Sequence, residues 1–443
     1  MAGSRELRTA AWYGDLPLEL EFPPHWTVVT RWPAPLPPLT DGQIAEALER
    51  PEGQLPIREL CRGKSRPLVV VDDLTRPTPA SRVLPLVLRH LQGAGIPPER
   101  VRVLMATGTH GPPGRDAWSK KLGPETAGRC QLIVHEHEDP GVRVGTTSWG
   151  TRVIADREVV SSDVVLGIGG VFPSANLGFS GGSKLALGVL GLKSIAQLHG
   201  GHPNVPAGRV DLGSSFRRDL DEIAAMIGLR TLITLHVDAD RLPVRVACGD
   251  YRLYYEREIA FARQAAMVEC DPDADVVVGN AFPSDVSLTI AVHKGASLLD
   301  DAPAGASRVL VASCSEGLGF HGLFPLAAPR GRLWRRVGRA LRVSPAEVRA
   351  RLADRLARRR ERPPAPPEVA ERPPRRHPLW VYRPGEHAEP LPEAIGDIRT
   401  SSSWRSILEA VSREQGSSRP LKATVYPCTP LLCLKHPPPK AAG

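Results

Sequence analysis

The stretch that decides the fold is RPLVVVDDLTRPTP, residues 66–79, in which four aliphatic residues run into a polar turn. An apolar run of this length without alternation is typical of a strand that is buried on both faces. The prolines of the turn end the strand and stiffen the chain that follows. The segment therefore predicts a central strand of a parallel sheet, with polar side chains at its carboxyl end.

The same pattern recurs along the chain. Helical patterns at 81–95 and 216–229 lie between some of the runs. A repeated order of strand, polar turn and helix indicates an α/β protein with a largely parallel sheet. The further runs are RVRVLMATGTHGPP (100–113), SDVVLGIGGVFPS (162–174), ADVVVGNAFPSD (274–285) and SRVLVASCSEGLG (307–319).

The length of 443 residues allows more than one domain. We expect two α/β domains with largely parallel sheets and the active site in the cleft between them, at the carboxyl ends of strands. Residues 1–268 are assigned to an N-terminal cofactor-binding domain and 271–420 to a C-terminal domain with a basic Pro/Arg-rich insertion at 329–376. The tail, 421–443, has one more strand-like run that either domain could take up, and we assign it to the N-terminal domain.

The net charge of +9 comes from one segment. Between Arg330 and Arg376 there are sixteen arginines and five acids, so the rest of the chain carries a net charge of about −2. A basic arm of this kind can contact nucleic acid or a membrane, and it can equally be a solvated insertion. We take the solvated insertion as the expectation, with no nucleic-acid partner.

Cysteine usage and the beginning of the chain bear on location. The seven cysteines are scattered and form no CxxC pair, which argues against a disulfide framework or a thiolate zinc site. No segment reaches signal-peptide or membrane-spanning character. We therefore expect a cytoplasmic protein without a membrane partner.

Two of the strand-end turns carry groups suited to acid–base chemistry. Asp73 and Arg76 follow the first strand, and a guanidinium can grip a carboxylate or phosphate through two parallel hydrogen bonds. An Asp–Arg pair that only ties the turn together is the structural alternative. Thr109 and His110 follow the second strand, where an imidazole suits a general base near neutral pH, although a lone histidine is often structural.

A third candidate is GFSGGSKLALGVLG, residues 178–191. Gly181 and Gly182 allow backbone N–H groups to form a nest for negative charge. Lys184 lies at an expected helix start, where desolvation lowers the pKa of an amine toward a nucleophilic range. The segment is not a P-loop, because Leu185 stands where the hydroxyl belongs. The alternative is a glycine-rich turn with an exposed lysine.

Two histidines follow at helical spacing, His199 and His202. The intervening Gly200 and Gly201 are expected to end the helix, which favours one imidazole ligand over a pair. A single imidazole does not hold a metal by itself, so a metal here would need further ligands.

Together these segments resemble the nickel-pincer nucleotide-dependent lactate racemase family over most of residues 10–325. The later His293-Lys294-Gly295 is similar to the family's lysine-glycine motif. The matching pieces, in family order, are DDLTRPTP (72–79), ATGTHGPP (106–113), VHEHEDP (134–140), GIGGVFPSANLGFSGGSK (167–184) and His199.

The resemblance implies a cofactor and roles for the candidates. Lys184 would be covalently attached to a nickel-pincer nucleotide, pyridinium-3,5-bisthiocarboxylic acid mononucleotide, and His199 would be the protein ligand to nickel. His110 would be a catalytic base, and Arg76 and Lys294 would hold the substrate carboxylate. The remaining cofactor-binding positions would be Asp73, Thr109, Gly181 and Gly182. The partners implied are a 2-hydroxy acid substrate and the proteins that make the cofactor.

The chain departs from the family pattern at three places. Ser174 stands where the family has its second catalytic histidine, and a serine hydroxyl is not a base near neutral pH. Ala291 replaces a glutamine, and the usual Pro-Gly between lysine and histidine is reduced to Gly188. We therefore expect a racemase or epimerase for a 2-hydroxy acid other than lactate. The alternative is a non-catalytic relative that carries the cofactor or binds a hydroxy acid.

Overall fold

The computed structural model describes residues 6–114, 116–326, 377–385, 390–416 and 419–435. The basic insertion predicted at 329–376 and residues 436–443 of the tail lie outside these ranges. What the sequence predicts for those two segments stays a prediction.

The stretch 66–79 forms a central strand of a six-stranded sheet, as predicted. The sheet order is β13-β12-β9-β4-β5-β6, and neighbours are parallel except β12 and β13. The sheet's strands are β4 (Pro67–Asp72), β5 (Arg102–Ala106), β6 (Gln131–Val134), β9 (Val164–Gly170), β12 (Leu229–Val237) and β13 (Pro243–Asp250).

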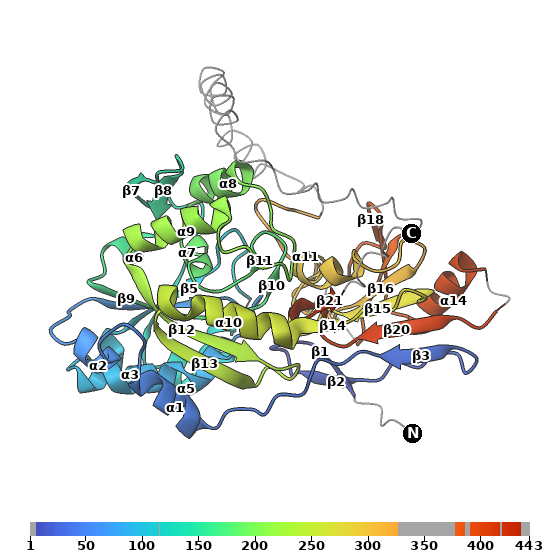
Figure 1. The fold of residues 1–443 in the computed structure, drawn as a ribbon, viewed down its shortest axis with the longest axis horizontal. Helices are drawn as coiled ribbons and strands as arrows, with labels where there is room; N and C mark the ends of the chain where they lie inside the picture. The colour runs from blue at the N-terminus through green and yellow to red at the C-terminus, as the bar shows by residue number, and fades with distance from the viewer. Residues whose placement is uncertain (1–5, 115, 327–376, 386–389, 417–418, 436–443) are drawn as a thin grey trace, which may run out of the picture.

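Strand β4 is buried on both faces because helices cover both sides of its sheet. Leu68 and Val70 belong to one apolar core, whereas Val69 and Val71 belong to the other. Figure 1 shows α1 and α3 below this sheet and α9 and α10 above it. The helices of this half are α1 (Asp41–Glu49), α2 (Ile57–Leu60), α3 (Leu84–Gly93), α4 (Ala117–Leu122), α5 (Pro124–Ala127), α6 (Arg157–Val160), α7 (Lys184–Leu187), α8 (Leu192–Gly201), α9 (Ser215–Met226) and α10 (Tyr251–Ala266).

A second, seven-stranded sheet has the order β18-β19-β17-β16-β15-β20-β3, with only β18 and β19 antiparallel. Helices α11 (Leu288–Leu299) and α14 (Trp404–Glu414) pack into its two cores. Its strands are β3 (Thr27–Thr30), β15 (Val276–Asn280), β16 (Ser307–Val311), β17 (Leu379–Tyr382), β18 (Ala394–Ile395), β19 (Ile398–Ser401) and β20 (Lys422–Tyr426). The expected α/β class with largely parallel sheets is confirmed.

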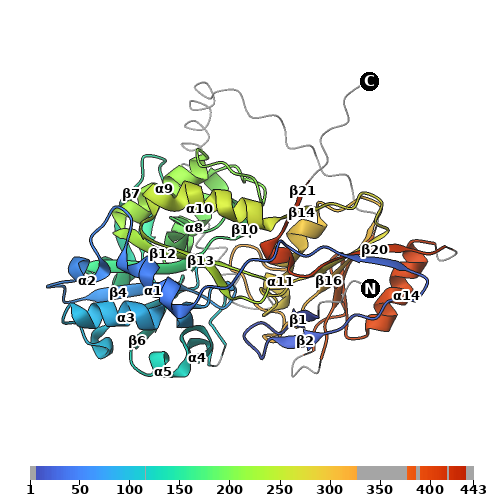
Figure 2. The ribbon, with the colours of Figure 1, turned by 60° about the horizontal axis from the view of Figure 1, so that its bottom comes forward.

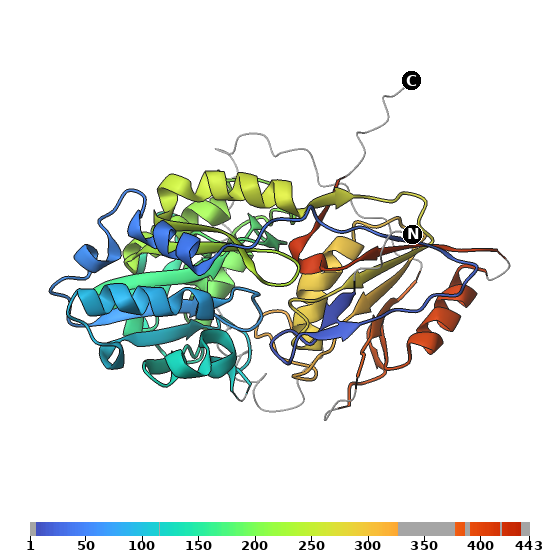
Figure 3. The same ribbon diagram turned by 90° about the horizontal axis from the view of Figure 1, so that it is seen from below.

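Both ends of the chain join this second sheet. Strand β20 pairs with β15 and with β3, so the tail run lies in the second sheet between a strand of the C-terminal part and one from residues 27–30. Figure 2 and Figure 3 show the blue N-terminal segment crossing from the first half to lie beside red β20. We propose that the domain boundaries follow the sheets, with the segment before α1 grouped with the C-terminal half.

The remaining strands form two-stranded pairs around this frame. They are β1 (Leu7–Thr9) with β2 (Leu16–Leu18), β7 (Val142–Thr146) with β8 (Arg152–Ala155), β10 (Pro173–Ser174) with β11 (Gly178–Phe179), and β14 (Met267–Glu269) with β21 (Cys433–Lys435). Single 3-10 turns occur at Ala80–Arg82, Pro98–Arg100 and Thr429–Leu431. No helix in the described ranges has both the length and the apolar character to cross a membrane.

The order of the first sheet fixes where a ligand can enter. From β4 the chain proceeds through α3 to β5 on one side, while β9 returns to the other side of β4 and leads into α7, α8 and α9. The connections that follow β4 and β9 therefore diverge to opposite faces. In open α/β sheets such a divergence opens a crevice at the carboxyl ends of the strands.

Candidate active site

A cavity of about 300 Å³ lies at these strand ends. It is walled from the other side by α11 and by the loop that follows β16, so both sheets contribute to it. All ten residues singled out from the sequence line this cavity: Asp73, Arg76, Thr109, His110, Ser174, Gly181, Gly182, Lys184, His199 and Lys294.

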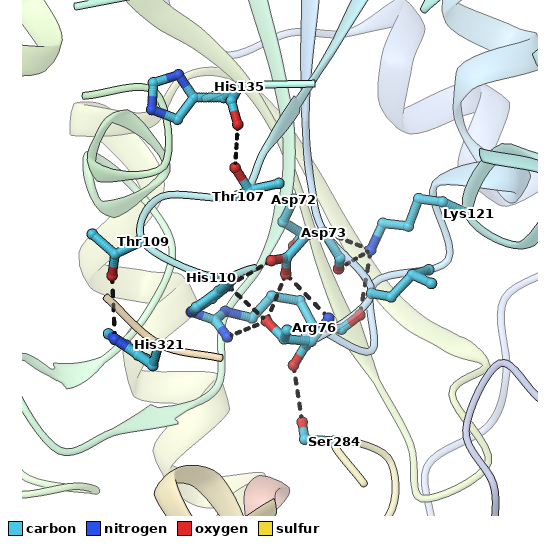
Figure 4. A network of polar contacts seen from close by, with 12 residues as sticks. Asp72, Asp73, Arg76, Thr107, Thr109, His110, Lys121, His135, Ser284 and His321 are labelled. Atoms are coloured by element: carbon cyan, nitrogen blue, oxygen red, sulfur yellow. Dashed lines mark hydrogen bonds and ion pairs between the residues drawn. The ribbon is translucent and has the colours of Figure 1, made fainter. Parts of the chain in front are cut away.

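His110 is oriented by Asp73. The two residues follow β4 and β5, and His110 Nδ1 lies 2.5 Å from Asp73 Oδ2 (Figure 4). Burial alone would raise the pKa of Asp73, but the neighbouring His110 and Arg76 and a hydrogen bond from Thr75 hold that pKa below its ordinary value. A carboxylate only accepts, so Nδ1 of His110 carries a proton and Nε2 is left as the basic nitrogen.

Arg76 forms no salt bridge with an acidic side chain in the described part of the chain. Its Nη1 donates to Thr75 Oγ1 at 2.8 Å. The alternative of an Asp–Arg pair that only ties the turn is therefore not what the structure shows. The guanidinium keeps donors for a carboxylate in the cavity.

The turn after β4 is held instead by Lys121, a residue that the sequence did not single out. Lys121 is fully buried, and its Nζ lies 2.5 Å from Asp72 Oδ1 and donates to the carbonyl oxygens of Asp73 and Arg76. Burial lowers the pKa of Lys121 and raises that of Asp72, while each partner opposes the other's shift. No motif in the sequence marks this lysine.

Lys184 begins helix α7, as predicted, and its Nζ donates to Ser174 Oγ. Burial, followed by the nearby charges of Lys294, Arg76 and Arg217, lowers the pKa of Lys184 well below its ordinary value. An amine in this position is neutral, and therefore nucleophilic, over a wider range of pH than a free lysine.

The glycines before Lys184 are needed for backbone shape. Gly181 and Gly182 have φ of +83° and +56°, a region that favours glycine. A Cβ on Gly181 would come within 2.6 Å of Val171, and one on Gly182 would meet Tyr255 at 3.2 Å. Packing against the protein therefore also requires glycine at both positions, beside the nest for negative charge that the sequence predicts.

His199 presents one free ring nitrogen. Its Nδ1 lies 2.8 Å from the carbonyl oxygen of Ile195, one turn earlier in α8, so Nδ1 donates and Nε2 keeps its lone pair. Burial lowers the pKa of His199 to about 4. Helix α8 ends at Gly201, and His202 is its extended C-cap, so the expectation that these glycines end the helix is confirmed.

His202 does not line the cavity. It is bound to Ser215 and Asp219, at 3.0 and 2.8 Å. Both ring nitrogens of His202 are therefore engaged by the protein. In the described ranges no three His, Cys, Asp or Glu side chains are grouped to hold a metal.

Helix α11 of the second half contributes Lys294. Burial and the charge of Arg76 lower its pKa to about 7, although Asp73 acts in the opposite direction. Ala291, three residues earlier, is fully buried and offers no polar side chain.

The loop after β16 adds two residues to the cavity that no sequence pattern marks, His321 and Phe324. This loop pairs with the loop after β5, since Gly322 N donates to Thr109 O at 2.7 Å. The rings of His110 and His321 are 5.2 Å apart, and Phe324 contacts both His321 and His199. Both are single residues that lie far from the other motifs in the sequence, so no motif indicated them.

Comparison with known sequences identifies relatives. A family model described as the lactate racemase N-terminal domain matches residues 13–208. The lactate racemase of Lactiplantibacillus plantarum is 26% identical over 288 residues, which cover 63% of this chain and 68% of that protein. The lactate racemase of Thermoanaerobacterium thermosaccharolyticum is 25% identical over 291 residues, with 63% and 67% covered.

Solved structures agree on the fold. The lactate racemase apoprotein from Thermoanaerobacterium thermosaccharolyticum superposes with a TM-score of 0.67 at 19% identity, covering 98% of this chain and all of that one. A protein from Thermotoga maritima gives a TM-score of 0.58 at 18% identity, with 90% and 99% covered. The match to residues 13–208, the related sequences and the shared fold all make this chain similar to lactate racemases.

Proposed function

We propose that this protein is a racemase or epimerase that interconverts the stereoisomers of a 2-hydroxy acid other than lactate, with a nickel-pincer nucleotide attached at Lys184. Similarity to lactate racemases supports racemase or epimerase chemistry. The cofactor and the substrate class are proposed because one cavity holds all the groups that this chemistry needs. They are the proposed base, two cations for a carboxylate, a lysine of low pKa and an imidazole with a free nitrogen: His110, Arg76, Lys294, Lys184 and His199.

The residues present fit the cofactor. The lowered pKa of Lys184 leaves an amine that can form a covalent bond, and Nε2 of His199 is an unprotonated nitrogen donor. A histidine whose other nitrogen is bound to a carbonyl is the usual form of a metal-ligating imidazole. When bound, the cofactor supplies reversible hydride acceptance.

The chain's own residues handle the substrate and its proton. Arg76 and Lys294 line the cavity from the two halves of the molecule, after β4 and on α11, and can both bind a substrate carboxylate. His110 accepts the proton of the 2-hydroxyl at Nε2, and the charged Asp73 stabilises the imidazolium that results. Returning that proton to the oxygen completes the cycle.

Ser174 and Ala291 support a substrate other than lactate. Ser174 accepts a hydrogen bond from Lys184, and as an alcohol it does not act as a base near neutral pH. Ser174 lines the cavity and is smaller than the histidine expected there, which favours a longer substrate than lactate. The absence of a second catalytic histidine, where Ser174 stands, also motivates the alternative: a relative that carries the cofactor but does not catalyse a reaction.

The test is to co-express the chain with the cofactor-making proteins and incubate it with single enantiomers of α-deuterated 2-hydroxy acids. Chiral chromatography should reveal the opposite stereoisomer of one of them, with deuterium retained because hydride transfer does not exchange with water. Loss of the deuterium to solvent would contradict hydride transfer. A nickel-loaded chain that converts nothing across a broad panel, with lactate included, would favour the non-catalytic alternative.

A further inference from the structure

The loop after β16 places a histidine in the cavity that no sequence motif marked. His321 lines the same cavity as His110 and Lys294, and the two histidine rings meet edge to face at 5.2 Å. Thr109 Oγ1 lies 3.3 Å from His321 Nδ1 (Figure 4). His321 therefore sits beside the proposed base, on the opposite half of the molecule.

The hydrogen bonds of His321 fix its tautomer. The backbone N–H groups of Leu323 and Phe324 both donate to Nδ1, at 3.2 and 3.3 Å. A backbone N–H cannot accept, so Nδ1 carries no proton. The ring is then a neutral imidazole with its proton on Nε2, and none of the described residues accepts a hydrogen bond from that nitrogen.

The surroundings keep the ring neutral. Burial, followed by electrostatic coupling to His110, His293 and Lys294, lowers the pKa of His321 to about 2. His293 binds the carbonyl oxygen of Phe324 through its own Nε2 at 2.6 Å, which holds the same loop in place. A second proton on His321 would also break the two backbone hydrogen bonds to Nδ1.

We propose that His321 is a catalytic residue, which donates a hydrogen bond from Nε2 to the substrate's 2-oxygen while His110 removes the proton from that oxygen. This role rests on the proposed function. The hydroxyl proton moves to His110, the oxygen keeps the electron pair that the O–H bond held, and His321 retains its own proton throughout. A preorganised donor aimed at developing negative charge typically contributes roughly 10²- to 10³-fold to kcat.

The chain offers a matched pair of variants. Asparagine at position 321 can present an oxygen near Nδ1, which keeps the loop contacts, but it has no donor near Nε2. Glutamine places an amide N–H near Nε2 and gives up the Nδ1 contacts. For the nickel-loaded enzyme, His321→Asn should lose roughly 10²-fold in kcat with KM changed by less than about threefold, and His321→Gln should recover at least about tenfold. If His321→Asn were as active as the wild type, or His321→Gln the worse of the two, the role would be purely structural.

A second measurement does not depend on activity. In two-bond ¹H–¹⁵N spectra of the full chain, with His321→Asn used to assign the signals, His321 should remain a neutral Nε2–H tautomer from pH 5.5 to 8.5. An imidazolium or an Nδ1–H tautomer in that range would overturn the proposal even if turnover were normal. If the wild type were inactive on every 2-hydroxy acid, the proposed function would fail and the catalytic role with it, whatever the tautomer.

Discussion

The catalytic competence of His110 depends on one carboxylate. Asp73 is buried, charged and 2.5 Å from His110 Nδ1. Asp73→Asn removes the charge that fixes the tautomer and stabilises the imidazolium, so kcat should fall by roughly 10²- to 10⁴-fold. Steady-state rates of the nickel-loaded variant check this, with intact mass confirming that the lysine is still modified. A fully loaded Asp73→Asn enzyme with the kcat of the wild type would contradict the assignment of His110 as the base.

The lowered pKa of Lys294 predicts that the stability of the cofactor-free protein depends on pH. Its pKa is about 7 when folded, against an ordinary value of about 10.4. Between these values the unfolded chain binds more protons than the folded one, so this residue makes the free energy of unfolding rise with pH, by at most about 1.4 kcal/mol per pH unit. Below pH 7 both states are protonated and the contribution is flat.

The measurement is urea unfolding of the wild type and of Lys294→Met between pH 6.5 and 9.5. Other groups titrate in both proteins, so the quantity of interest is the difference between the two curves. The free energy of unfolding of the wild type, relative to that of Lys294→Met, should increase as pH rises. Parallel curves would show that Lys294 has an ordinary pKa in the folded protein.

At the scale of elements, the turn after β4 is stabilised by the buried pair of Lys121 and Asp72. Lys121→Met leaves Asp72 buried without a cation and frees two carbonyl oxygens, so the free energy of unfolding should drop by about 3–5 kcal/mol. Arg82→Met, which breaks the exposed pair with Asp41, should cost less than about 1 kcal/mol. Equal costs for the two variants in chemical denaturation would contradict a structural role for the buried pair.

The strands and their turns were largely predictable because burial on both faces leaves a direct imprint on sequence. The runs at 66–79, 100–113 and 162–174 became β4, β5 and β9, and the polar residues that follow them meet in one cavity. Strand β3 was not predictable, since its residues are mostly exposed and its partner lies almost four hundred residues away. His321 was missed for the same reason: a tertiary contact between two loops positions it.

At the scale of the whole molecule, the N-terminal segment is attached to the second half through Asp285. This fully buried carboxylate accepts hydrogen bonds from Thr9 Oγ1 and from the backbone N–H groups of Ala10 and Ala11. Asp285→Ala would strand those donors, so the free energy of unfolding should fall by at least about 3 kcal/mol. Asp240→Ala, which removes an exposed partner of Arg8, is the control and should cost less than about 1 kcal/mol. Both changes can be read from urea denaturation midpoints, and an unchanged midpoint for Asp285→Ala would contradict this attachment.

The arrangement of both halves around one amine makes Lys184 the centre of the account. The most direct test is intact-mass and peptide analysis of the chain co-expressed with the cofactor-making proteins, beside Lys184→Ala and Lys184→Arg. We expect a covalent addition on Lys184 with stoichiometric nickel in the wild type. We expect no addition in either variant, because arginine keeps the charge but offers no amine. A wild-type chain that carries only its encoded mass under those conditions, or an addition that persists in Lys184→Ala, would contradict it.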